Sequence, residues 1–147
     1  MYRFSFVAMA VAAVGITGYL AAAAKAVVPY PQGYRAWQFV KSEVIGPGHE
    51  LYSLVGGLHH VYANAEALEG YRTGRFPDGS VLVFDLFEAV EKDHAVDAGA
   101  RRALFVMHKD AKRYAASAGW GWEGFAGGEP GTRQVDAAIA QKCVACH

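Results

Sequence analysis

The sequence contains only two cysteines among its 147 residues, and both lie in the last five positions. A small domain held together by several disulfides is therefore excluded. Positive charge is not in excess, because 14 Lys and Arg residues balance 14 Asp and Glu residues, and this argues against a dedicated nucleic-acid binder. No internal repeat is present, which excludes solenoids and propellers. The length leaves room for one domain, and 53% hydrophobic against 19% charged residues indicates a folded one.

Acidic residues are absent from the start of the chain, since the first is Glu43. One cation precedes an apolar and small-residue segment over 4–24, and Ala24-Lys25-Ala26 fits the small-x-small cleavage rule. We therefore predict a signal peptide over 1–26 and an exported domain over 27–147. The alternative is an uncleaved N-terminal membrane anchor, because the 21 residues of 4–24 are just enough to span a bilayer. Both interpretations export the domain.

The exported part lacks β-α-β alternation, which favours an α+β fold with a predominantly antiparallel sheet, a few short helices and a C-terminal helix. Apolar patterning predicts strands over Leu54–Tyr62, Ser80–Glu88 and Ala100–His108, the last two pairing as a hairpin. Helix signals predict helices over Tyr34–Val44, over Ala65–Arg72 between the cap residues Asn64 and Gly74, and from Thr132 or Arg133 into Cys143. Glu91–Gly99 and Gly124–Gly131 are predicted to be loops.

Side-chain alternation makes a prediction about the faces of these strands. Phe84 and Asp85 are adjacent on one strand, so they are expected to lie on opposite faces of the sheet. The same argument separates His59 from His60, so that at most one of them faces a given pocket.

The chain ends Cys143-Val144-Ala145-Cys146-His147, the C-x-x-C-H signature of c-type haem attachment. Two thiols one helical turn apart add to the two vinyl groups of one porphyrin, and the adjacent histidine then reaches the iron. The alternatives are a redox dithiol, which lacks a thioredoxin-like context, and half a zinc site, which lacks a second cysteine pair. The motif favours one haem c, attached through two thioethers at Cys143 and Cys146, with His147 as the iron ligand.

Methionine is scarce, and the side of the iron opposite His147 has no marked ligand. An electron-transfer cytochrome usually supplies a second methionine or histidine there. After removal of 1–26, Met107 is the only methionine, and none of the histidines is singled out as a sixth ligand. For His59, a structural role in a sheet, a place in the distal pocket and axial ligation all remain open. An open sixth position would make this a ligand-binding or catalytic haem.

Several short segments together resemble the cytochrome P-460 family, which includes cytochrome c′-beta. They are Y-R-A-W (34–37), H-H-V-Y-A-N (59–64), F-P-D-G-S-V-L-V (76–83), H-K-D-A-K-R-Y (108–114), G-W-G-W (119–122) and the terminal C-V-A-C-H. The resemblance implies a largely antiparallel β domain with helices, one covalent haem c with a five-coordinate ferric iron, and a periplasmic homodimer.

The departures from the family pattern separate two activities. Cytochrome P-460 proper oxidises hydroxylamine and carries a lysine cross-linked to the haem, together with a pocket carboxylate, whereas cytochrome c′-beta binds nitric oxide in a phenylalanine-capped pocket. The resemblance aligns Phe84 with the lysine, Phe105 with the pocket glutamate and His59 with a distal arginine. Such a pocket is more apolar than that of the hydroxylamine oxidiser, which favours a c′-beta-like protein without the cross-link.

We therefore expect an exported mono-haem protein with an open distal site that binds nitric oxide or a related small nitrogen ligand. A haem enzyme that oxidises hydroxylamine, or acts as a weak peroxidase, is the alternative, and whether the chain is an enzyme stays open. A periplasmic electron-transfer cytochrome with a redox partner protein is the second alternative.

Overall fold

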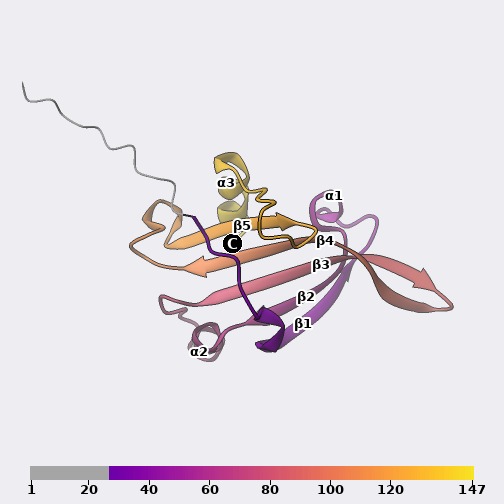
Figure 1. Cartoon of the computed structure of the whole chain (residues 1–147), viewed down its shortest axis with the longest axis horizontal. Helices are drawn as coiled ribbons and strands as arrows, with labels where there is room; N and C mark the ends of the chain where they lie inside the picture. The colour runs from indigo at the N-terminus through magenta and orange to yellow at the C-terminus, as the bar shows by residue number, and fades with distance from the viewer. Residues whose placement is uncertain (1–26) are drawn as a thin grey trace, which may run out of the picture.

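The computed structural model describes residues 27–147 (Figure 1). The predicted signal peptide or anchor over 1–26 lies outside the described residues, and none of the helices within 27–147 is long and apolar enough to cross a membrane. The elements are η1 Tyr34–Ala36, β1 Gln38–Ile45, α1 Tyr52–Val55, β2 Gly57–Ala63, α2 Ala65–Thr73, β3 Val81–Lys92, β4 Ala95–Lys109, η2 Ala115–Ser117, β5 Trp120–Ala126 and α3 Ala137–Cys146, where η marks a 3-10 turn.

The five strands form one antiparallel sheet in the order β1-β2-β3-β4-β5, as Figure 1 shows. The predicted α+β class with a mainly antiparallel sheet is confirmed. The predicted hairpin is confirmed too, because β3 pairs antiparallel with β4 and Phe84 lies opposite Phe105.

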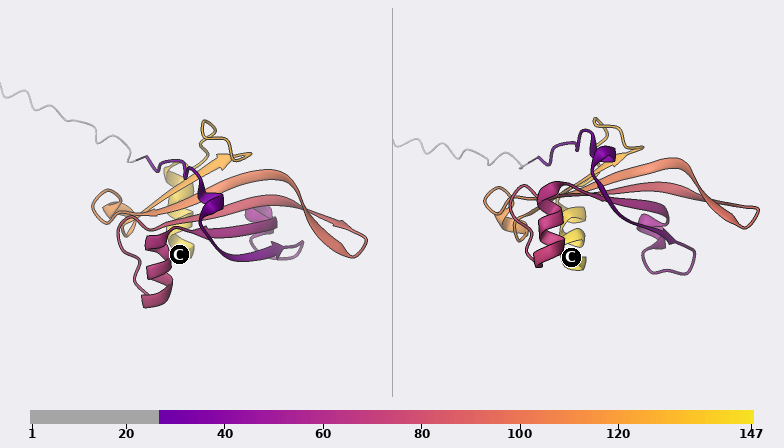
Figure 2. Two further views of the ribbon diagram at one scale, coloured as in Figure 1. Left: turned by 60° about the horizontal axis from the view of Figure 1, so that its bottom comes forward. Right: turned by 90° about the horizontal axis from the view of Figure 1, so that it is seen from below.

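The sheet has two differently covered faces (Figure 2). We call one the α3 face, because α2 and α3 lie against it, and it presents the side chains of His59, Phe84, Phe105 and Trp122. The other is the N-terminal face, covered by residues 27–36. Asp85 lies on the N-terminal face, which confirms the predicted separation of Phe84 from Asp85.

The main core lies on the N-terminal face. It consists of Val28, Tyr34, Val83, Leu104, Val106, Tyr114 and Phe125, all buried. Fully burying side chains of this size contributes about 1.5–3 kcal/mol each. Gly121 of β5 lets this layer approach the sheet, since a Cβ there would lie 2.4 Å from the Tyr114 ring and 2.6 Å from Val28. The segment 27–36 is therefore packed directly onto the strands.

The predicted helix after Asn64 is confirmed as α2. Its Asn64 Oδ1 accepts hydrogen bonds from the amide of Ala67 at 3.0 Å and from that of Val81 at 2.9 Å. The Nδ2 group donates to the carbonyl of Gly79 at 2.8 Å. Gly74 ends the helix with φ 76°, in the left-handed region that glycine tolerates. Asn64 thus fastens α2 to the start of β3.

We expect Asn64→Ala to lower the free energy of unfolding by about 2 kcal/mol, because both the helix cap and the link to β3 are lost. Asn64→Asp keeps the two acceptor contacts and loses only the donation to Gly79, so it should be less destabilising. Urea unfolding of the two variants measures the difference. Equal stability of wild type and Asn64→Ala would contradict this account.

The predicted helix over Tyr34–Val44 is wrong. Only the turn η1 forms there, and the chain then enters β1. The β-branched and aromatic residues of β1 suit a strand, and pairing with β2 satisfies its backbone groups. The aromatic spacing that suggested a helix has another origin, since the Tyr34 hydroxyl is fixed by Asp85 at 2.6 Å.

The predicted loop over Glu91–Gly99 is also wrong, because β3 and β4 continue through it to a two-residue turn. Asp93 and His94 form this turn with φ of 51° and 66°, and Lys92 pairs with Ala95 across it. Positive φ at both central residues suits the twist of a hairpin, and Asp tolerates it better than most residues.

Two boundaries near the C-terminus differ from the prediction as well. Strand β5 takes in 124–126, which were predicted as loop, because they pair with β4. The last helix begins at Ala137 rather than at Thr132 or Arg133, since the Asp136 carboxylate caps the amide of Ile139 at 2.8 Å.

Candidate haem-attachment site

The last helix, α3, carries both cysteines. Cys143 and Cys146 are three residues apart, so their thiols lie on neighbouring positions of one helix face. Neither forms a disulfide, Cys143 is half-buried and Cys146 is exposed. Burial raises the pKa of the Cys143 thiol. The helix therefore presents two free thiols at the spacing that double thioether formation requires.

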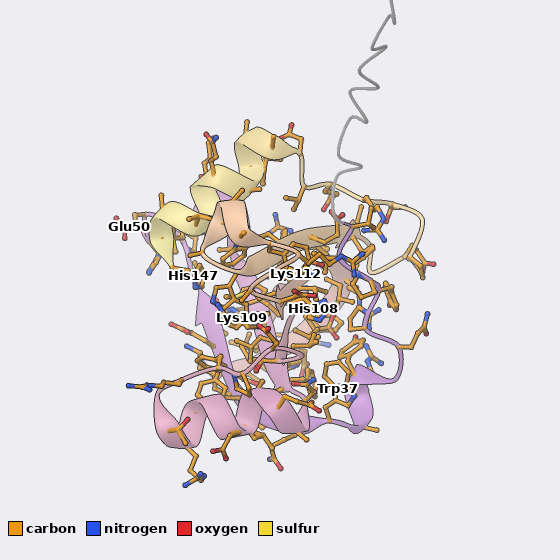
Figure 3. All side chains as sticks on the ribbon, turned by 90° about the vertical axis from the view of Figure 1, so that its left-hand side faces the viewer. Trp37, Glu50, His108, Lys109, Lys112 and His147 are labelled. Carbon is orange, nitrogen blue, oxygen red and sulfur yellow. The ribbon has the colours of Figure 1, made fainter. Side chains whose placement is uncertain are left out.

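His147 follows at the end of α3 (Figure 3), where its amide donates to the carbonyl of Cys143 at 3.2 Å. Its imidazole lies 5.0 Å from the Trp122 ring, measured between ring centroids. Trp122 belongs to β5 and lies on the α3 face. This contact directs the histidine toward the face of the sheet that presents Phe84 and Phe105.

Three residues predicted for the pocket lie side by side on that face. The His59 ring stacks on Phe84 with 4.0 Å between centroids and 22° between planes. Phe84 meets Phe105 edge to face at 6.1 Å. The α3 face thus combines aromatic side chains from β2, β3 and β4, and their role toward a cofactor stays a prediction.

His59 is the one titratable member of this group, with 2% of its surface exposed. Its Nε2 lies 3.6 Å from Oε2 of Glu43 on β1, whose carboxylate also accepts from Lys41 at 2.6 Å. Burial lowers the pKa of His59, and the Glu43 carboxylate opposes this shift only in part. Sequence reasoning missed Glu43, because only the register of β1 on β2 brings it beside His59.

The residues present fit a haem. Two thiols supply the points of covalent attachment, a neighbouring imidazole supplies the iron ligand, and the aromatic rings supply a flat apolar surface. Two buried polar atoms of the α3 face, His59 Nδ1 and Trp122 Nε1, have no hydrogen-bond partner within the described residues. Buried polar atoms normally have partners, so these two are suited to a polar group brought by a ligand.

A family model now decides between the interpretations of the motif. The model described as Cytochrome P460 matches residues 31–147, nearly all of the described chain. The chain belongs to the cytochrome P460 family. A search of curated proteins finds no match to it. As a member of this family, the protein is a haem c-type cytochrome involved in nitrogen-oxide chemistry, and the family is typically periplasmic.

In this member of the family, Cys143 and Cys146 would hold the porphyrin and His147 the iron. The iron, when bound, supplies a coordination position for small ligands. Within residues 27–147, no group of three or more His, Cys, Asp or Glu side chains is arranged to hold a metal ion on its own.

The other candidate residues of the sequence lie on both faces of the sheet. Met107 lies on the α3 face, where it pairs with Trp122. His60 lies on the opposite face from His59 and contacts the Ser42 hydroxyl, which confirms the predicted separation of the two histidines. Glu88 is exposed. Asp85 lies on the N-terminal face, so among residues 27–147 His59 is the buried titratable group on the α3 face.

The lowered pKa of His59 predicts a pH dependence of stability for this protein. Between that lowered pKa and the ordinary value of 6.5, the unfolded chain binds more protons than the folded one, so stability falls as the pH drops through this range. His108 is shifted in the same direction by burial. We expect His59→Gln to lose less stability than wild type between pH 7 and about pH 5.

Urea unfolding of the haem-loaded protein at both pH values measures this loss. His94→Gln, at the exposed hairpin turn, is the matched control and should behave like wild type. An unchanged acid loss in His59→Gln would show that burial of this imidazole does not set the dependence.

Proposed function

We propose that the chain is a cytochrome c′-beta-like member of the family, with an open distal site that binds nitric oxide or a related small nitrogen ligand. The observation that carries the proposal is the aromatic cluster on the α3 face, where Phe84 lies against both His59 and Phe105. Apolar walls favour neutral diatomic ligands over charged ones. The site would therefore bind such a ligand at the iron without supplying charge to it.

The placement of lysines supports the absence of a haem cross-link. The position aligned with the cross-linking lysine is Phe84. Two lysines do lie on the α3 face, and both have other partners. Lys41 Nζ binds Glu43, whereas Lys109 Nζ donates to the carbonyl of Ala118 at 2.9 Å. Lys109 also lies over the Trp120 ring at 5.3 Å, at the end of its strand.

One observation favours the enzymatic alternative, oxidation of hydroxylamine. The His59 and Glu43 pair places an imidazole and a carboxylate 3.6 Å apart beside Phe84. The lowered pKa of His59 leaves its imidazole neutral near pH 7, so it could accept a proton from a substrate. Simple electron transfer gains less support, because Met107 neighbours Trp122, the residue that His147 itself contacts.

Absorption spectra test the proposal. The full chain is produced in a host with c-haem maturation, and ferric and ferrous spectra are recorded with and without nitric oxide. A high-spin, five-coordinate ferric spectrum that shifts with nitric oxide is the expected result. A low-spin spectrum indifferent to the ligand would overturn it and favour electron transfer.

Substitution of Phe84 sharpens this test. Phe84→Ala opens space beside His59, so we expect nitric oxide to bind several-fold faster than in wild type. Phe39→Ala is the matched control, since Phe39 is 47% exposed and lies with Tyr62 on the N-terminal face. Equal association rates in both variants would remove Phe84 from the ligand path.

Turnover separates the enzyme from the binding protein. Steady oxidation of hydroxylamine with an added electron acceptor, lost in His59→Gln and kept in His60→Gln, would support the enzymatic alternative. We further propose a periplasmic homodimer, as the resemblance implies, and size-exclusion chromatography with light scattering tests the oligomeric state.

A further inference from the structure

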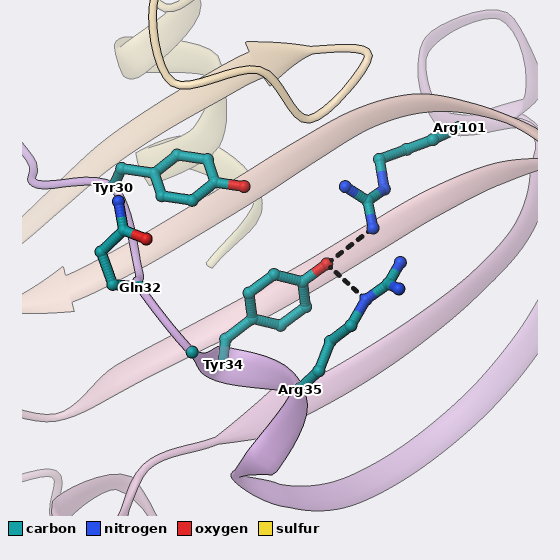
Figure 4. A pocket seen from close by; sticks show the side chains of 6 residues that line it. Tyr30, Gln32, Tyr34, Arg35 and Arg101 are labelled. Carbon is teal, nitrogen blue, oxygen red and sulfur yellow. Dashed lines mark hydrogen bonds between the residues drawn. The ribbon is translucent and has the colours of Figure 1, made fainter.

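The N-terminal face carries a hollow that haem attachment does not use. It has a volume of about 290 Å³ and is lined by Tyr30, Gln32, Gly33, Tyr34, Arg35 and Arg101. We call it the arginine pocket (Figure 4). Tyr34 contacts Asp85, which β3 presents on the face opposite Phe84, so the sheet separates this pocket from the α3 face.

Two guanidinium groups converge there on one hydroxyl. Arg101 Nη2 donates to the Tyr34 hydroxyl at 3.0 Å, and Arg35 Nε donates to it at 3.2 Å. The hydroxyl in turn donates to Asp85 Oδ2 at 2.6 Å. Arg101 Nε lies 3.0 Å from the other oxygen of Asp85, and Arg35 Nη2 lies 3.5 Å from Oδ2. The four side chains form one connected polar cluster.

The cluster carries a surplus of positive charge. Two guanidinium groups face one carboxylate. Burial and the bond to Asp85 raise the pKa of Tyr34 to about 12, so its hydroxyl stays neutral and adds no negative charge. No further acidic side chain is among the residues that line the pocket. Asp85 is 1% exposed, so it lies beneath the arginines rather than in the opening. An incoming anion therefore meets positive charge first.

Donor groups also remain uncommitted at this opening. Within residues 27–147, the Nη1 group of Arg35 has no partner, nor does the side-chain amide of Gln32. Arg35 is 60% exposed at its side chain, so its guanidinium can turn toward a ligand without leaving a buried charge behind. A planar guanidinium matches the two oxygens of a carboxylate better than it matches a spherical anion.

We propose that the arginine pocket binds a small organic carboxylate. The carboxylate pairs with Arg35 and Arg101, and the apolar part lies against the rings of Tyr30 and Tyr34, which Figure 4 shows to one side of the two guanidinium groups. The volume suits a ligand well below drug size. The site is independent of nitrogen-ligand binding at the iron.

Calorimetric titration of the haem-loaded protein tests the proposal at low salt, with benzoate and acetate as probes. We expect benzoate to bind with a dissociation constant on the order of a millimolar and acetate more weakly. The affinity should fall as salt is added, because the arginines are partly exposed. The haem absorption bands should not move, since the pocket lies across the sheet from His147, whereas binding at the iron would shift them.

Three variants identify the site. Arg35→Ala should weaken benzoate binding at least ten-fold, and Arg35→Lys should restore part of it, because the charge returns without the paired donors. Arg75→Ala removes one exposed arginine elsewhere and should bind as wild type does. Far-ultraviolet circular dichroism confirms that each variant is folded.

Several results would overturn the proposal. They are no heat of binding with benzoate, equal affinity in Arg35→Ala and Arg75→Ala, or a tetrahedral anion such as phosphate binding as tightly as benzoate. Each leaves the nitric oxide spectra unaffected, so the failure of this pocket and the failure of the proposed function are distinguishable.

Discussion

We expect the replacement of both Cys143 and Cys146 by serine to abolish covalent haem attachment. These are the only thiols of the chain, so no other side chain can replace them in a thioether. Wild type should keep its haem on a denaturing gel and through acidic solvent extraction, and the double variant should lose it completely. The measurement is haem staining together with the intact mass of the protein.

Single substitutions provide the control for this experiment. Cys143→Ser or Cys146→Ser leaves one thioether position, so either variant should retain less covalent haem than wild type and more than the double variant. His147→Ala keeps both thiols and should retain covalent haem with an altered iron spectrum. A wild-type chain without covalent haem would contradict the whole assignment of α3.

Among substitutions on the N-terminal face, Asp85→Ala should give the largest loss in the free energy of unfolding, about 3 kcal/mol. Asp85 is 1% exposed, bonds the Tyr34 hydroxyl at 2.6 Å and lies 3.0 Å from Arg101 Nε. Its removal leaves Arg101, which is 22% exposed, without its counter-charge, and frees η1 from the sheet. Chemical unfolding of the haem-loaded protein measures the loss.

Two further variants make this prediction specific. Asp85→Asn keeps an oxygen that can accept from Tyr34, so it should be less destabilising than Asp85→Ala. Asp97→Ala lies in the exposed part of β4 and should stay within about 0.5 kcal/mol of wild type. A loss of stability equal to that of Asp97→Ala would mean that Asp85 does not hold the first segment.

Local signals predicted the elements that depend on local chemistry. Asn64 and Gly74 mark the ends of α2, and alternation placed Phe84 and Asp85 on opposite faces. The helix predicted from Tyr34 failed because its aromatic spacing serves a contact with Asp85, 51 positions along the chain. The predicted loop over Glu91–Gly99 failed because a polar hairpin tip such as Asp93-His94 has the composition of a loop.

The candidate site likewise has one part that local sequence identified and one part that it did not. Cys143, Cys146 and His147 are adjacent in sequence, so their spacing alone identified the attachment motif. The meeting of His59 with Glu43 depends on the register between β1 and β2, which includes a bulge between Phe39 and Lys41. No local pattern in the sequence predicts such a register, so the carboxylate beside His59 could only be found in the structure.

The order of the strands has a consequence for how the chain acquires its structure. Every strand of the sheet pairs only with the strand before or after it in the chain, so no pairing joins strands that are distant in chain order. Proteins rich in such local pairings fold faster than those whose strands are joined over long distances. Strand β5 precedes both cysteines in the chain, and α3 contributes no strand to the sheet, so the sheet can form first and then present α3 to the haem.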